Sequence, residues 1–251
     1  MSGHSKWSTI KRAKGVADAR RGQLFTKLAR EVMIAVREGG SSPDQNYHLR
    51  LIMQKCRDNN MPSENIERAI KKGSGEMTGS TLAEVTFEGY GPGGAAIIIQ
   101  ALTDNRNRAL QEIRNIFNRG GGNMAEAGSV SWLFEHKGVI TMATSELDAE
   151  EVALWAIDAA AEDVKVEKNH LEIYTAPDKL ETVRRALEEK DVPIASAELS
   201  MIPKTTLNLN EEAALRVMKL LDRLEELDDV QRVFSNVDFS DEVLERLEAQ
   251  V

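Results

Sequence analysis

The first part of the chain places its hydrophobic residues at helical spacing. Between residues 24 and 36 they recur every three or four positions, at Leu24, Phe25, Leu28, Val32, Ala35 and Val36. Similar apolar faces follow within 49–56 and 66–70, and Pro62 suits the first turn of the later helix. The polar segment "GGSSPDQN" (39–46) is typical of a loop. This pattern predicts a small helical bundle.

After residue 82 the hydrophobic period changes to that of β-strands. "AEVTFEGY" and "AAIIIQALT" flank the loop "GPGG", which predicts a hairpin with a longer turn. Asp104 is the predicted N-cap of a helix that runs to about Arg119, where three glycines end it. "GSVSWLFE" (128–135) predicts a further strand.

The later segments alternate between strands and helices. Within 138–202 the order is strand, helix, two strands, helix and strand, which is the split unit of a ferredoxin-like fold. An amphipathic helix and a short strand follow and supply what the middle segment lacks. The predicted fold is therefore α+β with three domains: an N-terminal helical bundle (1–76) followed by two ferredoxin-like α/β domains. The last of these (138–202) is inserted into a discontinuous middle domain (77–137 plus 203–251).

Composition indicates a protein of a reducing, aqueous compartment. The mean hydropathy is −0.37, and no apolar run approaches the roughly 18 residues that cross a membrane. The charged N-terminus lacks the apolar core of a signal peptide, and the single cysteine, Cys56, has no partner for an internal disulfide. We expect a cytoplasmic protein that does not associate with membranes.

The formal charge of −9 is distributed unevenly along the chain. Residues 1–72 hold 15 Lys and Arg against 7 Asp and Glu, a net charge of +8, whereas the remaining residues carry −17. Such a split indicates a basic module that meets a polyanion, attached to an acidic body. The predicted nucleic-acid contacts are the cations on either side of Asp18, namely Lys6, Lys11, Arg12, Lys14, Arg20, Arg21, Lys27 and Arg30.

Two other interpretations of this basic stretch stay open. A run of charge is often a solvated helix face, and an Arg-rich leader with few acids is typical of a transit peptide. Against the second, the stretch continues into the apolar face at 24–36, so its removal would damage a core helix. On that helix Lys27, Arg30 and Arg37 lie within about 80° of one another, away from the apolar face.

Five residues are secondary candidates for nucleic-acid contacts: His4, Trp7, Tyr90, Arg106 and Arg108. Trp7 among cations suits stacking on a base, but packing on the bundle is the leading interpretation. The loop "EGYGPGG" around Tyr90 lacks the Lys-Ser/Thr pair of a P-loop and precedes a strand, so a constrained turn is the leading interpretation. The two arginines fit either a phosphate-tracking surface or ordinary solvated positions.

The sequence offers no constellation typical of an enzyme. The four histidines have no metal-ligand spacing, and Cys56 falls on the apolar side of a helix, as a buried thiol does. The chain also lacks a nucleophile elbow and a dinucleotide fingerprint. We expect a protein without catalytic activity, metal or cofactor.

Several motifs together resemble the YebC/PmpR family, which includes the mitochondrial translational activator of cytochrome c oxidase. They are "GHSKW", "FTKLAREV", "NMPSENIERAIKKGSGE", "FEGYGPGGAAIII", "TDNRNR", "GSVSWLFEHKGVI" and "LLDRLEELDDVQRVFSN". The resemblance covers essentially the whole chain. It implies a cytoplasmic three-domain α+β protein with a role in gene expression.

Two roles follow from the resemblance, and both ligands are polyanions. One is a transcriptional regulator that binds promoter DNA, and the other is a translation factor that binds ribosomal RNA and relieves stalling at proline-rich stretches. The helix after Pro62 offers few base-reading side chains beyond Asn65, Arg68 and Lys71, so sequence-specific readout is expected to be weak. An acidic scaffold with an incidental basic segment is a third hypothesis. The oligomeric state, monomer or homodimer, stays open.

Overall fold

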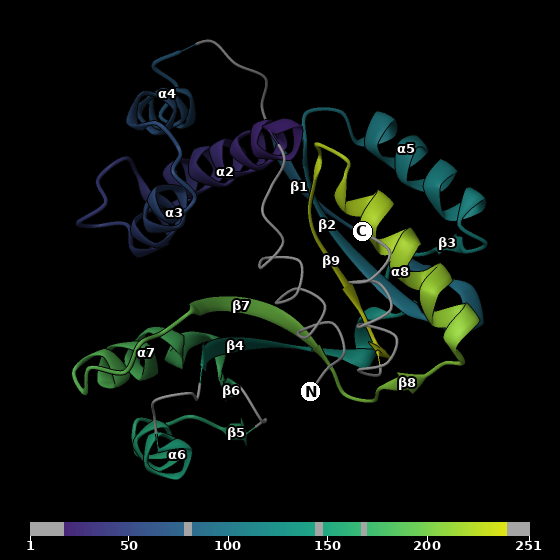
Figure 1. The fold of residues 1–251 in the computed structure, drawn as a ribbon. Helices are drawn as coiled ribbons and strands as arrows, with labels where there is room; N and C mark the ends of the chain where they lie inside the picture. Colours follow the sequence, from purple (N-terminus) through teal and green to yellow (C-terminus); the bar gives the residue numbers. More distant parts are fainter. Residues whose placement is uncertain (1–17, 78–81, 144–147, 167–169, 240–251) are drawn as a thin grey trace. The chain divides into compact units, whose positions relative to one another are not determined.

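The computed structural model describes residues 18–77, 82–143, 148–166 and 170–239 (Figure 1). Within these ranges the chain forms two compact units, one from 18–130 with 209–235 and the other from 131–208 with 236–239. The first unit contains a helical bundle and a four-stranded sheet, and the second contains another four-stranded sheet with its helices. The predicted class, a multi-domain α+β fold that begins with a helical bundle, is confirmed.

Three helices form the bundle: α2 (Asp18–Gly39), α3 (Tyr47–Asp58) and α4 (Ser63–Gly73). Their apolar faces share one core, in which Val32, Leu49 and Ile66 are buried. Asn46 joins two of the helices. Its side chain accepts a hydrogen bond from the Leu49 amide at the start of α3, and it donates to the carbonyl oxygens of Ala35 and Gly40 at the end of α2. The polar loop is therefore fixed to the core by one buried amide.

The sheet of the first unit has the order β3–β1–β2–β9, with all neighbours antiparallel. Its strands are β1 (Ala83–Tyr90), β2 (Ala96–Thr103), β3 (Asn123–Ala125) and β9 (Val230–Ser235). Helices α5 (Arg106–Arg119) and α8 (Glu211–Glu225) lie on the same side of this sheet (Figure 1). The predicted hairpin is confirmed, and the pairing of β9 with β2 confirms that the chain returns to this sheet after an insertion.

The inserted domain follows the ferredoxin-like order β5–β6–β4–β7. Its elements are β4 (Phe134–Ala143), α6 (Ala149–Asp158), β5 (Asp163–Val166), β6 (His170–Thr175), α7 (Leu180–Glu188) and β7 (Ser196–Pro203). A short parallel pair, β8 (Leu207–Asn208) and β10 (Val237–Asp238), follows it. The middle domain differs in connectivity, because its hairpin occupies the centre of the sheet and the order along the chain is ββαβαβ.

Local details of the sequence prediction around residue 130 are wrong. Residues 128–135 do not form one strand: Ser131–Leu133 is a 3-10 turn with Trp132 exposed, and the strand beside β1 at the edge of the middle sheet is the shorter β3. Strand β4 continues through residues 137 and 138, where the sequence had suggested a domain boundary. The N-cap of α5 is Asn105, whose side chain accepts from the Arg108 amide, in place of Asp104.

Candidate nucleic-acid interface

Part of the predicted interface lies outside the described residues. This holds for Lys6, Lys11, Arg12 and Lys14, for the secondary candidates His4 and Trp7, and for the side chain of Arg20. The three remaining cations of the predicted set, Arg21, Lys27 and Arg30, all lie on α2. Of these, the Arg21 side chain is exposed near the start of the helix.

Lys27 and Arg30 contact the middle domain of their own unit. The Lys27 Nζ donates to the Glu225 carbonyl oxygen at 2.5 Å, at the end of α8. The Arg30 guanidinium donates to the carbonyl oxygens of Leu102 and Asp228, at 3.2 and 2.5 Å, and to the Asp229 carboxylate at 2.8 Å. The structure thus gives both cations protein partners, where the helical pattern had placed them away from the apolar face and available to phosphates.

A third cation of the same stripe has a similar role. The Arg37 guanidinium donates to the Leu82 carbonyl oxygen at 2.6 Å, immediately before β1. Close by, Ile34 of α2 is buried with Leu82 and Leu102. Arg30 and Arg37 therefore flank an apolar contact through which the bundle packs on the middle domain.

Asp229 accepts hydrogen bonds from three side chains. Its Oδ1 accepts from Arg30, and its Oδ2 accepts from Arg108 and from the Thr103 hydroxyl, each at 2.8 Å. The carboxylate is only 5% exposed. Burial acts to raise the pKa of Asp229, but the hydrogen bonds from Arg108 and Thr103 and the charges of Arg30 and Arg108 outweigh it, so the pKa lies below its usual value.

Arg108 is consequently a connector between elements, although it was a candidate for a phosphate contact. Besides Asp229 it pairs with Asp104 one helical turn earlier, at 2.8 Å. Hydrogen bonds from its guanidinium to both carboxylates, Asp229 first, raise the pKa of Arg108 further above its ordinary value. Nothing in the sequence pattern marked Asp229, since it lies 121 positions from Arg108 and 199 from Arg30.

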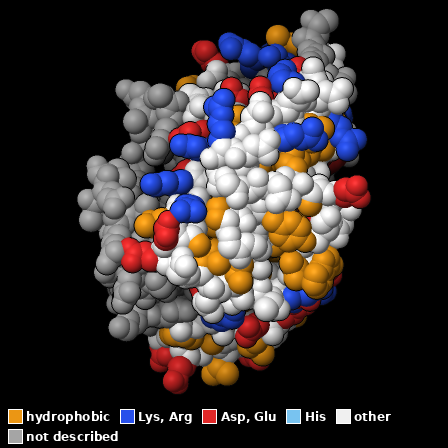
Figure 2. All heavy atoms as spheres, turned by 90° about the vertical axis from the view of Figure 1, so that its right-hand side faces the viewer, with side chains coloured by type: hydrophobic (Ala, Val, Ile, Leu, Met, Phe, Trp, Pro, Cys, Tyr) orange, Lys and Arg blue, Asp and Glu red, His pale blue; other side chains and the backbone are white. Residues whose placement is uncertain are grey.

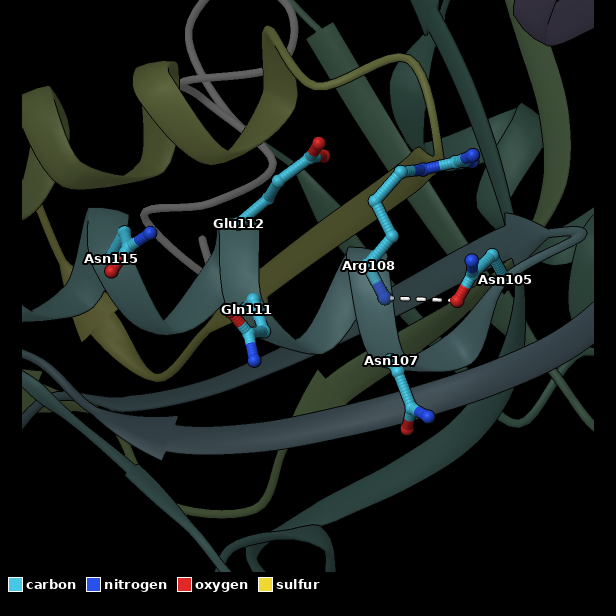
Figure 3. A pocket seen from close by; sticks show the side chains of 6 residues that line it. All are labelled: Asn105, Asn107, Arg108, Gln111, Glu112 and Asn115. Atoms are coloured by element: carbon cyan, nitrogen blue, oxygen red, sulfur yellow. Dashed lines mark hydrogen bonds between the residues drawn. The ribbon is translucent and has the colours of Figure 1, made fainter.

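The exposed side of α5 is rich in amides. Asn107, Gln111 and Asn115, together with Asn105, Arg108 and Glu112, line an open hollow of about 520 Å³. Figure 3 shows that Asn107 and Gln111 point away from Arg108 and Glu112, and that one helix with its N-cap supplies every lining residue. Arg106 is exposed beside it. The hollow is open to solvent, and its lining offers mainly hydrogen-bonding side chains.

On the face drawn in Figure 2, Lys and Arg side chains lie mainly in the upper half, above a group of hydrophobic side chains. Lys and Arg side chains lie there with Asp, Glu and uncharged side chains between them. This arrangement fits the acidic balance of the chain after residue 72.

Tyr90 and the glycine-rich loop form a constrained turn. The Tyr90 hydroxyl donates to the Ser129 carbonyl oxygen at 3.0 Å, and the buried Glu88 carboxylate accepts from the amides of Gly128 and Val130. Gly93 has a φ of 71°, in the left-handed region that favours glycine. The loop is therefore fastened to the segment after β3, and Glu88, which the sequence analysis missed, provides the attachment.

The described residues include no group of three or more His, Cys, Asp or Glu side chains that could hold a metal ion. Cys56 is buried in the bundle core, and burial, with a smaller contribution from Glu31, raises the pKa of its thiol to about 11. Its predicted character as a buried thiol is confirmed. None of the helices in the described part of the chain is both long and apolar enough to span a membrane.

The structure is that of a multi-domain α+β protein, and the sequence concentrates its positive charge in residues 1–72. Residues 5–76 match the family model for the TACO1/YebC protein N-terminal domain, and residues 82–237 match that for the TACO1/YebC second and third domain. The chain belongs to the TACO1/YebC family.

Similar proteins cover the chain almost completely. A probable transcriptional regulatory protein of Dehalococcoides mccartyi is 58% identical over the full length of both chains. A protein of the same name from Chloroflexus aurantiacus is 54% identical over 99% of this chain and 100% of its own. The crystal structure of a conserved hypothetical protein from Aquifex aeolicus superposes with a TM-score of 0.83 at 47% identity, covering 90% of this chain and 94% of that one.

Proposed function

We propose that the protein regulates gene expression by binding DNA through its N-terminal helical domain. The main support for this proposal is the separation of charge along the chain: residues 1–72 carry a net charge of +8, and the remaining residues carry −17. Cations that neutralise phosphates release counterions, which gives strong and salt-dependent binding, while the acidic domains limit non-specific adhesion. The names of the relatives support a regulator, and the cytoplasm is its proposed location.

A second candidate function is binding of ribosomal RNA by a translation factor. The observation that favours it is the small number of base-reading side chains on α4, where Asn65, Arg68 and Lys71 are the suitable ones. Recognition of structured RNA relies largely on shape and on the sugar–phosphate backbone, so it needs fewer such side chains.

The salt dependence of binding tests the phosphate contacts. If about five phosphates are neutralised on duplex DNA, the slope of log K against log salt is near −4.5. The variant K11Q/R12Q/R20Q/R21Q should reduce the magnitude of this slope by about 3.6. A control that removes four exposed cations elsewhere, K179Q/K204Q/K219Q/R223Q, should leave it unchanged. An equal reduction of the slope in both variants would contradict a specific N-terminal contact and indicate only a general attraction between the protein's cations and the DNA.

Crosslinking in cells, followed by sequencing of the bound nucleic acid, separates the two candidates. Enrichment of promoter fragments supports regulation of transcription. Enrichment of ribosomal RNA supports the translation factor and contradicts the DNA-binding proposal.

A further inference from the structure

A groove lies between α2 and α4 in the helical bundle. It has a volume of about 360 Å³, and its floor includes Phe25, Met33 and Met61. Phe25 and Met33 are half-buried against the core, and Met61 is buried. At one end stands Gly22, and no atom of the described residues lies within 4 Å of the position that a Cβ would take there. The side chains that α2 contributes to the groove are therefore mainly apolar.

The α4 side of the groove is polar and positive. Asn65, Arg68 and Lys72 line it. At about 100° per residue Lys72 lies within about 20° of Asn65, and Arg68 within about 60°, so the three share one side of the helix. Glu67 lies about 160° from Asn65 and does not belong to this side.

The rim side chains are not engaged within the described part of the protein. Asn65, Arg68 and Lys72 make no side-chain hydrogen bond and no ion pair there. Lys27 and Arg30 of the facing helix, by contrast, donate to carbonyl oxygens or to Asp229. Cations that have no partner among the described residues and lie beside an apolar floor are available to an anionic ligand that also has an apolar surface.

We propose that this groove binds an unpaired nucleotide of a single-stranded RNA or DNA. The base stacks on the Phe25 ring and contacts the two methionines, while the Asn65 amide, both donor and acceptor, pairs with the base edge. Arg68 and Lys72 neutralise the adjoining phosphates. A base within a duplex is covered on both faces by its neighbours and cannot reach this floor. The inference rests on the proposed nucleic-acid binding and adds that the ligand includes an unstacked base.

Affinity measurements on the full chain test the groove. Fluorescence anisotropy is measured with labelled single-stranded RNA, single-stranded DNA and duplex DNA of equal length. F25L, which keeps an apolar side chain but removes the aromatic face, should weaken single-strand binding about tenfold and leave duplex binding within about twofold. R68Q/K72Q should weaken single-strand binding to a similar extent. The control K219Q/R223Q removes two exposed cations of α8 and should bind as the unaltered protein does.

A crosslink on the unaltered protein makes the test independent of variant folding. An oligonucleotide with 5-iodouracil, irradiated in the complex and digested, should yield a crosslink at Phe25 in mass spectrometry. Preference for the RNA or the DNA strand identifies the source of the nucleotide.

Three results would overturn the proposal. Unchanged single-strand affinity in F25L together with crosslinks elsewhere leaves nucleic-acid binding intact but removes the groove from it. If the groove binds an acidic amphipathic peptide, and this peptide does not compete with the nucleic acid, the groove belongs to a protein partner. Absence of binding to all three probes ends the proposed function as well.

Discussion

The two helices that border the groove use their positive charge in different ways. On α2, Lys27 and Arg30 are partly buried and donate to carbonyl oxygens or to Asp229 of the middle domain. On α4, Arg68 and Lys72 are exposed and have no hydrogen-bond or ion-pair partner among the described residues. Equal charges in one basic segment therefore divide into cations that hold domains together and cations that remain available to a ligand.

This difference shows what a local concentration of charge leaves undetermined. The net charge of +8 for residues 1–72 states that a polyanion would be attracted. It does not state which side chains would touch it. For Arg30 and Arg108 the structure shows the contact directly: both donate to Asp229, because a buried carboxylate requires compensating donors from inside the protein.

Replacement of Asp229 should have the largest effect on stability. D229N removes a buried charge that faces two guanidinium groups, and we expect a loss of about 2–3 kcal/mol in the free energy of unfolding. Urea denaturation measures it. The matched control is D228N, because Asp228 contacts Arg30 through its backbone carbonyl and its own side chain is exposed. The control should change stability by less than about 0.5 kcal/mol.

The effect of D229N should depend on pH. The folded-state pKa of Asp229 is lowered, so its contribution is present above the ordinary carboxyl pKa and is lost as pH falls through the folded value. The difference in unfolding free energy between the unaltered protein and D229N should be constant above about pH 5 and narrow below about pH 4. If the difference in unfolding free energy became larger at acidic pH, the Asp229 side chain would not be ionised in the folded protein.

Removal of Arg30 should have a smaller effect. R30Q keeps a donor in place but loses the charge, and we expect a loss of about 1–2 kcal/mol because the Asp229 carboxylate keeps Arg108 and Thr103. Combining R30Q with D229N should cost less than the sum of the two single changes, since both remove the same contact. Additive losses in a double-mutant cycle would show that the two side chains do not interact.

The smallest effect on stability is expected for the groove rim. R68Q/K72Q removes two exposed charges without hydrogen bonds in the described protein, so the free energy of unfolding should stay within about 0.5 kcal/mol of the original value. Thermal or urea unfolding monitored by circular dichroism measures it. A loss of unfolding free energy as large as that of R30Q would show that Arg68 and Lys72 stabilise the fold, as Arg30 does.

Periodicity predicted the helices and the central hairpin because both are local. The apolar face at 24–36 lies within α2, and the turn at 91–94 joins β1 to β2 as expected. The three-residue strand β3 is too short to show a strand period. Trp132 and Leu133 were assigned to a strand because they are hydrophobic, but they belong to a 3-10 turn. Short edge elements are set by pairing with neighbours, which the sequence does not display.

The site was less predictable than the fold. Residue type and charge indicated nucleic-acid binding, but the pairing of Arg30 with a carboxylate 199 positions away depends on tertiary packing. Glu88 was missed for the same reason, because the amides that it binds lie 40 and 42 positions away. For Asn46, the bond to the Leu49 amide is a local helix cap, but the bond that it donates to the Ala35 carbonyl oxygen depends on the packing of two helices. By contrast, of the three base-reading residues noted on α4, Asn65 and Arg68 line a groove, whereas Lys71 does not.

The most direct test compares two variants that lose the same charge, K27Q/R30Q and R68Q/K72Q. Their affinity for one single-stranded oligonucleotide is measured over a range of salt, well below the unfolding transition. R68Q/K72Q should reduce the magnitude of the slope of log K against log salt by about 1.4, whereas K27Q/R30Q should keep the original slope despite its lower stability. An equal reduction in both variants, or a reduction in K27Q/R30Q alone, would contradict the division between structural and ligand-binding cations.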